Sequence, residues 1–402
     1  MPEAEGTSDM PEQLKVGVVG LGIRGLWLAR MASEGAHTQL QAVADMNPRM
    51  LDIARMMFPD IAFYGSGEDM AREADIAAVL IGTGDRFHAG NAREALRHGK
   101  HVLIEKPLAQ SFEDMREIAR LRRESGLVVG TFLELRFSGL WGRVKAIVGS
   151  GEIGAVLSAY LAEYVGRDKG QFFGRGKTRS RENVVSLVLQ KGVHGLDLMN
   201  WLVASSPRRV SAVGARRFFG GEEPADKHCR DCDRRETCEH AMNHKRWLDP
   251  PGVELEHGED YCVWSQAADV EDVSLVNIEY ASGVVGSYHE VHFAPYYGMH
   301  MTLFGSQAQL DVEANHDTGV AYIEVTRRYG NRDQRRERPT RDTGHGGADP
   351  ALLADFAAAC HEGREPLCNL QAGYESAGQR VLVEEFLRTP SPQAGDEERR
   401  KV

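Results

Sequence analysis

Three glycines directly behind a short apolar run constrain the fold of the first third of this chain. Gly20, Gly22 and Gly25 follow the apolar residues 16–19, and Asp45 comes 20 residues after the last glycine. The apolar run predicts a buried strand, the residues behind the glycines predict a helix, and the next apolar run predicts a second strand that ends in the acid. This order is typical of the βαβ unit that binds a dinucleotide at its first turn.

The glycines and the acid each have an expected role in that unit. Gly20 allows the tight turn, Gly22 lets the backbone approach a pyrophosphate, and Gly25 lets the helix pack closely on the strand. The diphosphate then meets the free N–H groups at the start of the helix. Asp45 accepts hydrogen bonds from the ribose hydroxyl groups and repels a 2′-phosphate, which favours NAD over NADP.

Strands and helices continue to alternate up to about residue 135. Such alternation predicts an α/β fold with a doubly wound parallel sheet, a Rossmann domain over residues 14–135. Ligands bind at the carboxyl ends of such strands. Thr83 and the triplet Glu105-Lys106-Pro107 follow two of the later strands, so we expect them in the same cleft as the glycine turn.

The pattern changes beyond residue 136, where strand-like runs follow one another without intervening helices. This predicts a second α/β domain over residues 136–388, with a large open, mostly antiparallel sheet. An open sheet with an exposed apolar face favours a homodimer or a homotetramer. The other expected elements are a helix at 186–202, a loop at 329–347, helices at 350–362 and 372–387, and disordered tails at 1–13 and 389–402.

The charge balance and the apolar content exclude several classes of protein. The 402 residues carry 48 Lys and Arg against 59 Asp and Glu, a net charge of −11, which argues against nucleic acid or an anionic membrane as a partner. No run approaches the roughly 20 apolar residues of a membrane helix. Residues 1–13 lack the basic start and apolar centre of a secretory signal. We therefore expect a cytoplasmic protein whose six cysteines are thiols or metal ligands.

The motifs in this order resemble the Gfo/Idh/MocA oxidoreductases from about residue 15 to residue 388. The resemblance rests on the glycine turn, Gly82-Thr83-Gly84 with His88, Glu105-Lys106-Pro107, Gly151-Glu152-Ile153-Gly154 and His194-Gly195-Leu196-Asp197. It implies hydride transfer from a sugar or cyclic polyol to NAD(P). It also implies the cofactor-binding residues Gly20, Gly22, Ile23, Arg24, Gly25, Asp45, Thr83, His88, Glu105 and Lys106.

The resemblance implies two catalytic residues. Removal of hydride from a secondary alcohol needs a base for the hydroxyl proton and a positive group beside the developing alkoxide. The resemblance gives this place to Lys106, at a strand end near the nicotinamide. His194 is the second candidate, as a general acid or base or as a hydrogen-bond partner of the substrate.

One position departs from the family pattern. Many members carry an acid four residues before the helix histidine, and here that residue is Gln190, followed by Lys191. Lys191 lies on the same helical face as His194 and is the third catalytic candidate, with an ordinary surface lysine as the alternative. A complete Asp–Lys–His proton relay therefore does not transfer to this chain.

A basic segment at residues 167–181 contains six Lys and Arg residues in an otherwise acidic chain. One interpretation is a lid that binds an anionic substrate, such as a sugar acid, a phosphate or a sulfonate, and the other is a solvated loop. The expected substrate residues are Lys177 and Arg179 from this segment and Arg136 from the domain junction.

Three closely spaced cysteines, Cys229, Cys232 and Cys238, favour a metal site in a loop over residues 226–262. The resemblance adds Cys262 as the fourth ligand, because some family subgroups pair such a triplet with a later cysteine. The alternatives for the fourth position are His228 and His240. A four-thiolate zinc ion would fold a loop that has little core of its own, so we expect a structural ion.

Three hypotheses for the function follow. The first is an NAD-dependent oxidoreductase that acts on a carbohydrate or polyol. The second is a redox-neutral NAD-dependent glycosidase, which oxidises C3, eliminates the aglycone, adds water and reduces the ketone again. An anionic sugar such as a sulfoquinovoside would suit the basic segment. The third is a non-catalytic NAD-bound sensor, which predicts loss of the pair Lys106 and His194, yet both residues are present.

Overall fold

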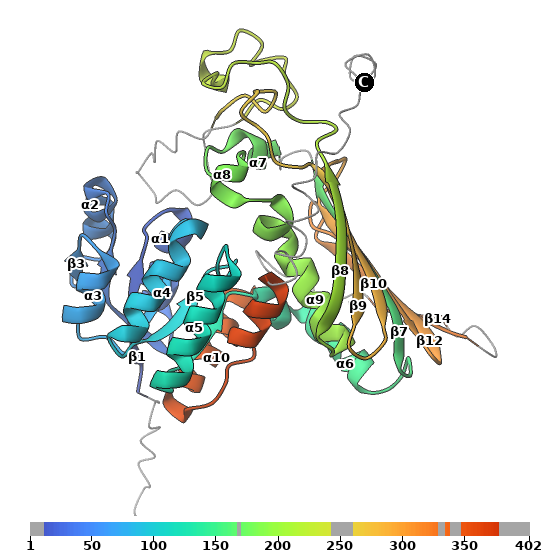
Figure 1. The fold of residues 1–402 in the computed structure, drawn as a ribbon, viewed down its shortest axis with the longest axis horizontal. Helices are drawn as coiled ribbons and strands as arrows, with labels where there is room; N and C mark the ends of the chain where they lie inside the picture. Colours follow the sequence, from blue (N-terminus) through green and yellow to red (C-terminus); the bar gives the residue numbers. More distant parts are fainter. Residues whose placement is uncertain (1–11, 167–169, 243–259, 329–333, 338–346, 378–402) are drawn as a thin grey trace, which may run out of the picture.

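The computed structural model describes residues 12–166, 170–242, 260–328, 334–337 and 347–377. Within these ranges the chain forms two sheets, each with helices packed on it, that lie side by side (Figure 1). No helix in the described ranges is long and apolar enough to cross a membrane.

The first sheet has six strands, all parallel, in the order β3-β2-β1-β4-β5-β6. Its strands are β1 (Leu14–Val19), β2 (Thr38–Ala44), β3 (Ala62–Tyr64), β4 (Ala78–Ile81), β5 (His101–Ile104) and β6 (Val129–Thr131). The helices between them are α1 (Ile23–Glu34), α2 (Pro48–Met57), α3 (Gly67–Glu73), α4 (His88–Arg97) and α5 (Phe112–Ser125). The predicted doubly wound sheet is confirmed, but β3 and α3 were not predicted from the sequence.

The helices packed on the first sheet differ in whether a side chain caps their N-terminus, which matters for ligand binding. Asn47 caps α2, Ser66 caps α3 and Ser111 caps α5, each by accepting a hydrogen bond from a backbone N–H of the first turn. Gly22 before α1 and Phe87 before α4 offer no side-chain cap. The N–H groups at the start of α1 are therefore left for an anionic ligand.

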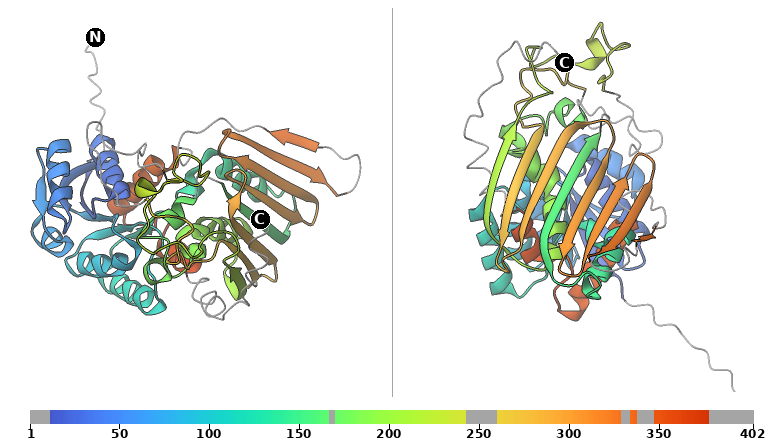
Figure 2. Two further views of the ribbon diagram at one scale, coloured as in Figure 1. Left: turned by 90° about the horizontal axis from the view of Figure 1, so that it is seen from above. Right: turned by 90° about the vertical axis from the view of Figure 1, so that its right-hand side faces the viewer.

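The second sheet has eight strands in the order β14-β13-β12-β11-β7-β10-β9-β8 (Figure 2). Its pairs are antiparallel as predicted, except that β10 runs parallel to β7. The predicted loop at 329–347 is wrong at residues 334–337, which form the edge strand β14. The strands are β7 (Val156–Gly166), β8 (Pro207–Ala215), β9 (Val273–Tyr280), β10 (Val285–Ala294), β11 (Gly298–Gly305), β12 (Ala308–Asn315), β13 (Val320–Arg327) and β14 (Gln334–Glu337).

Helices cover the face of the second sheet that is turned toward the first (Figure 1). They are α6 (Gly139–Gly149), α7 (Gln171–Gly174), α8 (Arg181–Val184) and α9 (Val193–Val203). The helix predicted at 186–202 is interrupted, because a π-helical turn at Val188–Gly192 precedes α9. Apolar residues of α6 and α9 form one core with this face of the sheet, among them Trp141, Leu196 and Tyr280.

The C-terminal part of the described chain returns to the first sheet. Leu352 and Phe356 of α10 (Ala348–Glu362) belong to the same core as Val16 of β1, and Asn369 forms a bridge to Gly130 of β6. The domain limits near residues 135 and 388 remain predictions. Residues 1–11 of the first predicted tail, the tail at 389–402 and the end of the helix predicted at 372–387 lie outside the described residues.

The inner face of the second sheet generates a stability prediction. Leu303 of β11 is fully buried between Ala159 of β7 and Leu310 of β12. Leu303→Ala leaves a cavity and is expected to lower the free energy of unfolding by about 2–5 kcal/mol in urea denaturation. Val285→Ala on β10 is the control, because Val285 is 54% exposed and its truncation should change stability by less than about 0.5 kcal/mol. Equal losses in both variants would contradict the assigned faces of the sheet.

Candidate active site

A cavity of about 1240 Å³ lies where the carboxyl ends of the first sheet face the inner side of the second sheet. Its walls come from the turn after β1, the ends of β4 and β5, the π-helical turn and strands β7, β11 and β12. The predicted cofactor residues that line it are Gly20, Gly22, Ile23, Arg24, Asp45, Thr83, His88, Glu105 and Lys106. The sequence therefore identified most of one wall.

The glycine turn has the backbone geometry that its sequence predicts. Gly20 has a φ of +85°, a left-handed conformation that favours glycine. A Cβ atom at Gly25 would lie 1.6 Å from the carbonyl oxygen of Gly20, so a side chain there would push α1 off the turn. A Cβ atom at Gly22 would meet nothing within 4 Å. Open space therefore lies beside the uncapped start of α1, where a diphosphate fits.

Asp45, directly after β2, is oriented by the backbone. Its Oδ2 accepts a hydrogen bond from the N–H of Leu21 at 2.6 Å, and its Oδ1 accepts one from the N–H of Asn47 at 2.8 Å. Each carboxylate oxygen keeps a further lone pair for a ribose hydroxyl group. After β4 of the same sheet, Thr83 Oγ1 and Asp85 Oδ2 are buried without a hydrogen-bond partner among the described residues, which suits groups that bind a cofactor. The residues of this wall thus fit NAD.

Arg24 is fixed by two carboxylates. Its Nε donates to Glu105, while Nη1 and Nη2 donate to the two oxygens of Asp349 at 2.8 and 3.0 Å. Burial opposes the charge of Arg24, but Glu105 and Asp349 outweigh it and raise the pKa of the guanidinium group. Asp349 lies in the first turn of α10, so the C-terminal helix helps to hold the glycine turn in place.

His88 links two strand ends under the cavity. Its ring nitrogens lie 2.7 Å from the carbonyl oxygen of Pro107 and 3.1 Å from that of Thr83. The ring is almost completely buried. We interpret His88 as a residue that holds the loops after β4 and β5 together at the cofactor wall.

Lys106 follows β5 and reaches across the cavity to the second domain. Its Nζ donates a hydrogen bond to the backbone carbonyl of Gln190 at 2.5 Å. Burial lowers the pKa of Lys106, partly opposed by Asp85 and Glu105, and the nearby charge of Lys191 lowers it further. A lysine with a lowered pKa is a neutral amine in a larger fraction of molecules, so it can accept a proton from a substrate hydroxyl group.

The π-helical turn at Val188–Gly192 presents both Gln190 and Lys191 to the cavity. A π-turn displaces backbone groups from the α-helical register and is common at functional sites. Here it offers the Gln190 carbonyl to Lys106. Because the acceptor is a backbone atom, the contact does not depend on an acid at position 190.

Lys191 is not an ordinary surface lysine. Its ammonium group is paired with Glu163 of β7, and the two side chains are 12% and 0% exposed. Burial opposes the charge of Lys191, but Glu163 outweighs it and raises the pKa of Lys191 well above its usual range. Lys191 is therefore a fixed cation on the cavity wall and not a base.

His194 also lines the cavity, on the first turn of α9. Its Nε2 lies 3.6 Å from a carboxylate oxygen of Glu134, and both side chains are buried. Glu134 and Glu163 were not predicted from the sequence, although signals for both exist in it. Glu134 follows the end of β6, the same strand-end position that identified Lys106, and Glu163 interrupts the apolar inward positions of β7.

Of the three predicted substrate residues, only Lys177 lines the cavity. Arg136 instead forms two hydrogen bonds with the carboxylate of Asp197 on α9, at 2.9 and 2.7 Å. Arg179 lies over the ring of Tyr261, 3.6 Å from its centroid. The structure therefore places Arg136 and Arg179 in contacts within the protein and leaves Lys177 as the substrate candidate.

The four predicted zinc ligands are all free thiols that do not form a closed metal site. Cys229 and Cys262 are buried, whereas Cys232 and Cys238 are partly exposed. Among the described residues, no three of these sulfur atoms lie within 4.8 Å of one another. Tetrahedral zinc, with Zn–S bonds of about 2.3 Å, needs sulfur atoms about 3.8 Å apart. The thiols as placed do not fit the ion.

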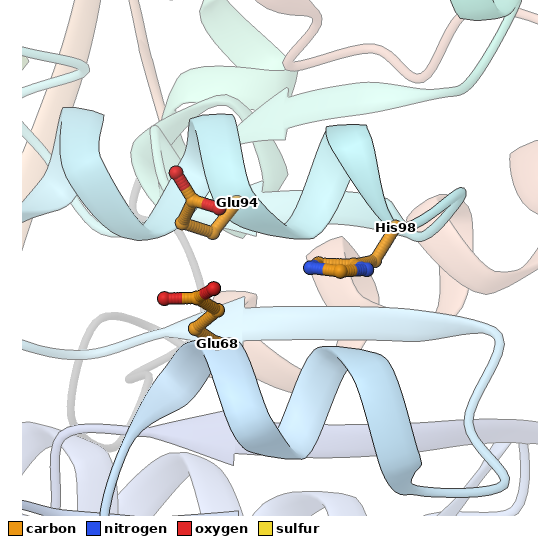
Figure 3. Close-up of side chains that lie close together, drawn as sticks. All are labelled: Glu68, Glu94 and His98. Atoms are coloured by element: carbon orange, nitrogen blue, oxygen red, sulfur yellow. The ribbon is translucent and has the colours of Figure 1, made fainter.

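One other group of metal-ligand side chains lies together in the described part of the chain. Glu68 of α3 approaches Glu94 and His98 at the end of α4 (Figure 3). Glu68 is exposed, and Glu94 already accepts a hydrogen bond from Arg97 at 2.6 Å. None of the three lines the cavity. Exposed carboxylates often lie together without an ion, so this cluster has no assigned function.

Two family models match the chain. Residues 14–132 match the oxidoreductase family with an NAD-binding Rossmann fold, and residues 141–311 match the GFO/IDH/MocA C-terminal domain. The protein YteT of Bacillus subtilis (strain 168) is 24% identical over 385 residues, which cover 87% of this chain and 88% of that protein. An inositol 2-dehydrogenase of Burkholderia multivorans is 29% identical over 194 residues, 47% of this chain and 54% of that protein.

Solved structures share the fold over nearly the whole chain. Levoglucosan dehydrogenase in complex with NADH and levoglucosan has a TM-score of 0.71 at 20% identity and covers 95% of this chain and 100% of that one. Scyllo-inositol dehydrogenase from Lactobacillus casei with bound NAD(H) and scyllo-inositol has a TM-score of 0.67 at 18% identity, covering 94% and 97%. At these identities the likeness shows the fold.

The position of Asp45 generates a binding prediction. Asp45→Ala removes the charged acceptor for the ribose hydroxyl groups, so the dissociation constant of NAD is expected to rise about 10- to 100-fold in isothermal titration calorimetry. Asp52→Ala is the control, because Asp52 is an exposed carboxylate on the neighbouring helix α2. An unchanged NAD affinity in Asp45→Ala would contradict this contact.

Proposed function

The chain belongs to the Gfo/Idh/MocA oxidoreductase family, and from this premise we propose that it oxidises a secondary hydroxyl group of a sugar or polyol with NAD. The observation that carries the proposal is the presence of two buried lysines whose pKa values are shifted in opposite directions. Lys106 has a lowered pKa, and Lys191 is held as a cation on the same cavity wall. Relatives of similar fold include dehydrogenases of inositol and levoglucosan.

The residues divide the reaction between them. Neutral Lys106 accepts the hydroxyl proton of the substrate. The ammonium group of Lys191 stabilises the negative charge that develops on the same oxygen. Bound NAD supplies the hydride acceptor. His194, oriented by Glu134, donates a hydrogen bond to a neighbouring hydroxyl group and fixes the ring of the substrate.

A redox-neutral NAD-dependent glycosidase is the second candidate. The same two lysines could serve this reaction. A neutral Lys106 can also remove the proton from a carbon next to a ketone, and Lys191 can stabilise the enolate that forms. Lys177 and Arg175 line the substrate side of the cavity and would suit an anionic group such as a sulfonate. A non-catalytic sensor is less well supported, because Lys106 and His194 both line the cavity.

The two candidates are separated by a screen with NAD. Free sugars, sugar acids, polyols and aryl glycosides are incubated with the protein, and NADH absorbance and aglycone release are followed together. A dehydrogenase accumulates NADH with a free sugar or polyol. A redox-neutral glycosidase releases the aglycone without net NADH and needs NAD only in catalytic amounts.

Lys106 provides the mutational and pH prediction. With the lowered pKa, kcat/KM is expected to rise as pH increases and Lys106 loses its proton, with a midpoint below the ordinary value of 10.5. Lys106→Met should lower kcat about 10²- to 10⁴-fold and abolish this rise. Lys100→Met is the control, at the opposite end of β5 and outside the cavity. Full turnover by Lys106→Met would show that the base has been assigned wrongly.

We also propose that Cys229, Cys232, Cys238 and Cys262 hold a structural zinc ion. Their close spacing in the sequence supports this proposal. The loop must contract for the four sulfur atoms to meet one ion. Metal analysis of the purified protein is expected to give about one zinc per chain, and a content near zero would refute the site.

The oligomeric state and the cellular location are also part of this proposal. Among the described residues, no helix covers the outer face of the second sheet in Figure 2. Three apolar side chains of its strands are exposed, those of Val213, Val285 and Phe304, so we propose that a second copy of the chain covers this face in a homodimer or homotetramer. All six cysteines are free thiols, which supports a cytoplasmic location.

A further inference from the structure

Lys191 is the cavity end of a buried polar cluster that continues into the second sheet. Glu163 of β7 and Glu290 of β10 are direct register partners on adjacent parallel strands. Both are buried, at 0% and 1% exposure. Tyr288 lies two residues before Glu290 and is buried beside them. Two ionised carboxylates in such a position repel each other strongly.

The hydrogen bonds of Tyr288 show how the repulsion is avoided. Its hydroxyl oxygen lies 2.9 Å from Oε2 of Glu163 and 2.6 Å from Oε2 of Glu290. Burial, reinforced by the two acids, raises the pKa of Tyr288 well above its usual value, so it remains a phenol with one proton. One proton can be donated to one carboxylate only. The second contact is a hydrogen bond only if the other carboxyl group carries a proton of its own.

The neighbours of the two acids decide which of them is protonated. Glu163 faces the ammonium group of Lys191, which favours its ionised form. Glu290 faces Nε2 of His292, and the buried Nδ1 of His292 has no hydrogen-bond partner among the described residues. The buried Glu271 adds a further carboxylate near Glu290, which repels a negative charge on Glu290. These surroundings place the proton on Glu290.

Two glycines allow the cluster to meet the cavity. A Cβ atom at Gly192 would lie 2.4 Å from Oε2 of Glu290, and one at Gly195 would lie 2.4 Å from the ring of Tyr288. Side chains at these positions would separate the π-helical turn from the sheet. The turn that carries Lys191 is therefore seated directly on the cluster.

We propose that Glu163 is a positioning residue that holds Lys191 as an ammonium group at the cavity wall, and that Glu290 carries the proton that lets the two acids lie side by side. The acid absent at position 190 is thus replaced by one from the sheet. The inference rests on the proposed function, because it makes Lys191 the fixed cation beside the substrate oxygen. The other groups that act on Lys191 are Tyr297, Glu290 and Lys106.

The test measures the charge of Lys191 without an assay of activity. The full-length protein is treated with acetic anhydride between pH 6 and 10, and acetylation of each lysine is quantified by peptide mass spectrometry. The reference is Lys15, whose side chain is 43% exposed. Only a neutral amine reacts. Without Glu163, burial lowers the pKa of Lys191, so Glu163→Gln is expected to raise its acetylation rate at pH 8 by about tenfold or more.

Glu290→Gln is the matched variant, since both acids bond the same tyrosine. A glutamine resembles a protonated acid, so Lys191 should stay as unreactive in Glu290→Gln as in the unmodified sequence. Equal acetylation of Lys191 with and without Glu163 would refute the positioning role. A rise in Lys191 acetylation of about tenfold in Glu290→Gln over the unmodified sequence would show that Glu290 is ionised and overturn the proton assignment. This comparison does not require Glu163→Gln to fold.

The outcome is separate from that of the proposed function. If no sugar or polyol reduces NAD while acetylation follows the expected pattern, the substrate assignment fails and the charge of Lys191 stands. If the protein is an active dehydrogenase whose Lys191 reacts equally in all variants, the inference fails and the function stands.

Discussion

The hydrogen bond from Lys106 to the backbone carbonyl of Gln190 is the contact on which the cavity depends. Lys106 follows a strand of the first sheet, and Gln190 lies in the π-helical turn that covers the second. The bond joins the cofactor wall to the substrate wall across 84 residues of sequence. Since the acceptor is the backbone, a glutamine is tolerated where many family members have an acid.

The same contact brings two lysines with opposite environments together. Burial dominates at Lys106 and favours the neutral amine, whereas the carboxylate of Glu163 dominates at Lys191 and favours the cation. Groups whose surroundings separate their pKa values in this way can divide proton transfer and charge stabilisation between them. The π-helical turn matters because it places Lys191 on the cavity wall, where the carboxylate of Glu163 on β7 balances its charge.

Features that depend on neighbouring residues could be predicted from the sequence, whereas contacts between residues far apart in the sequence could not. The first sheet was readable because its strands are apolar runs and its glycine turn needs a left-handed residue at Gly20. Strand β3 has three residues, too few to show the alternation of apolar and polar residues that identifies a strand. The π-helical turn was read as part of a helix, because five residues barely alter a helical pattern. Arg136 was expected at the substrate, but no local signal revealed its partner Asp197, 61 residues away.

The sequence by itself determined the dinucleotide unit, the acid Asp45 after its second strand and the place of Lys106 at a strand end. These depend on local backbone geometry and on the periodicity of neighbouring residues. Only the tertiary structure decided that Lys191 faces Glu163, that Glu163 lies beside Glu290, and that Arg136 turns to Asp197. Such pairs arise from strand register and from the docking of one element on another, and a short stretch of sequence encodes neither.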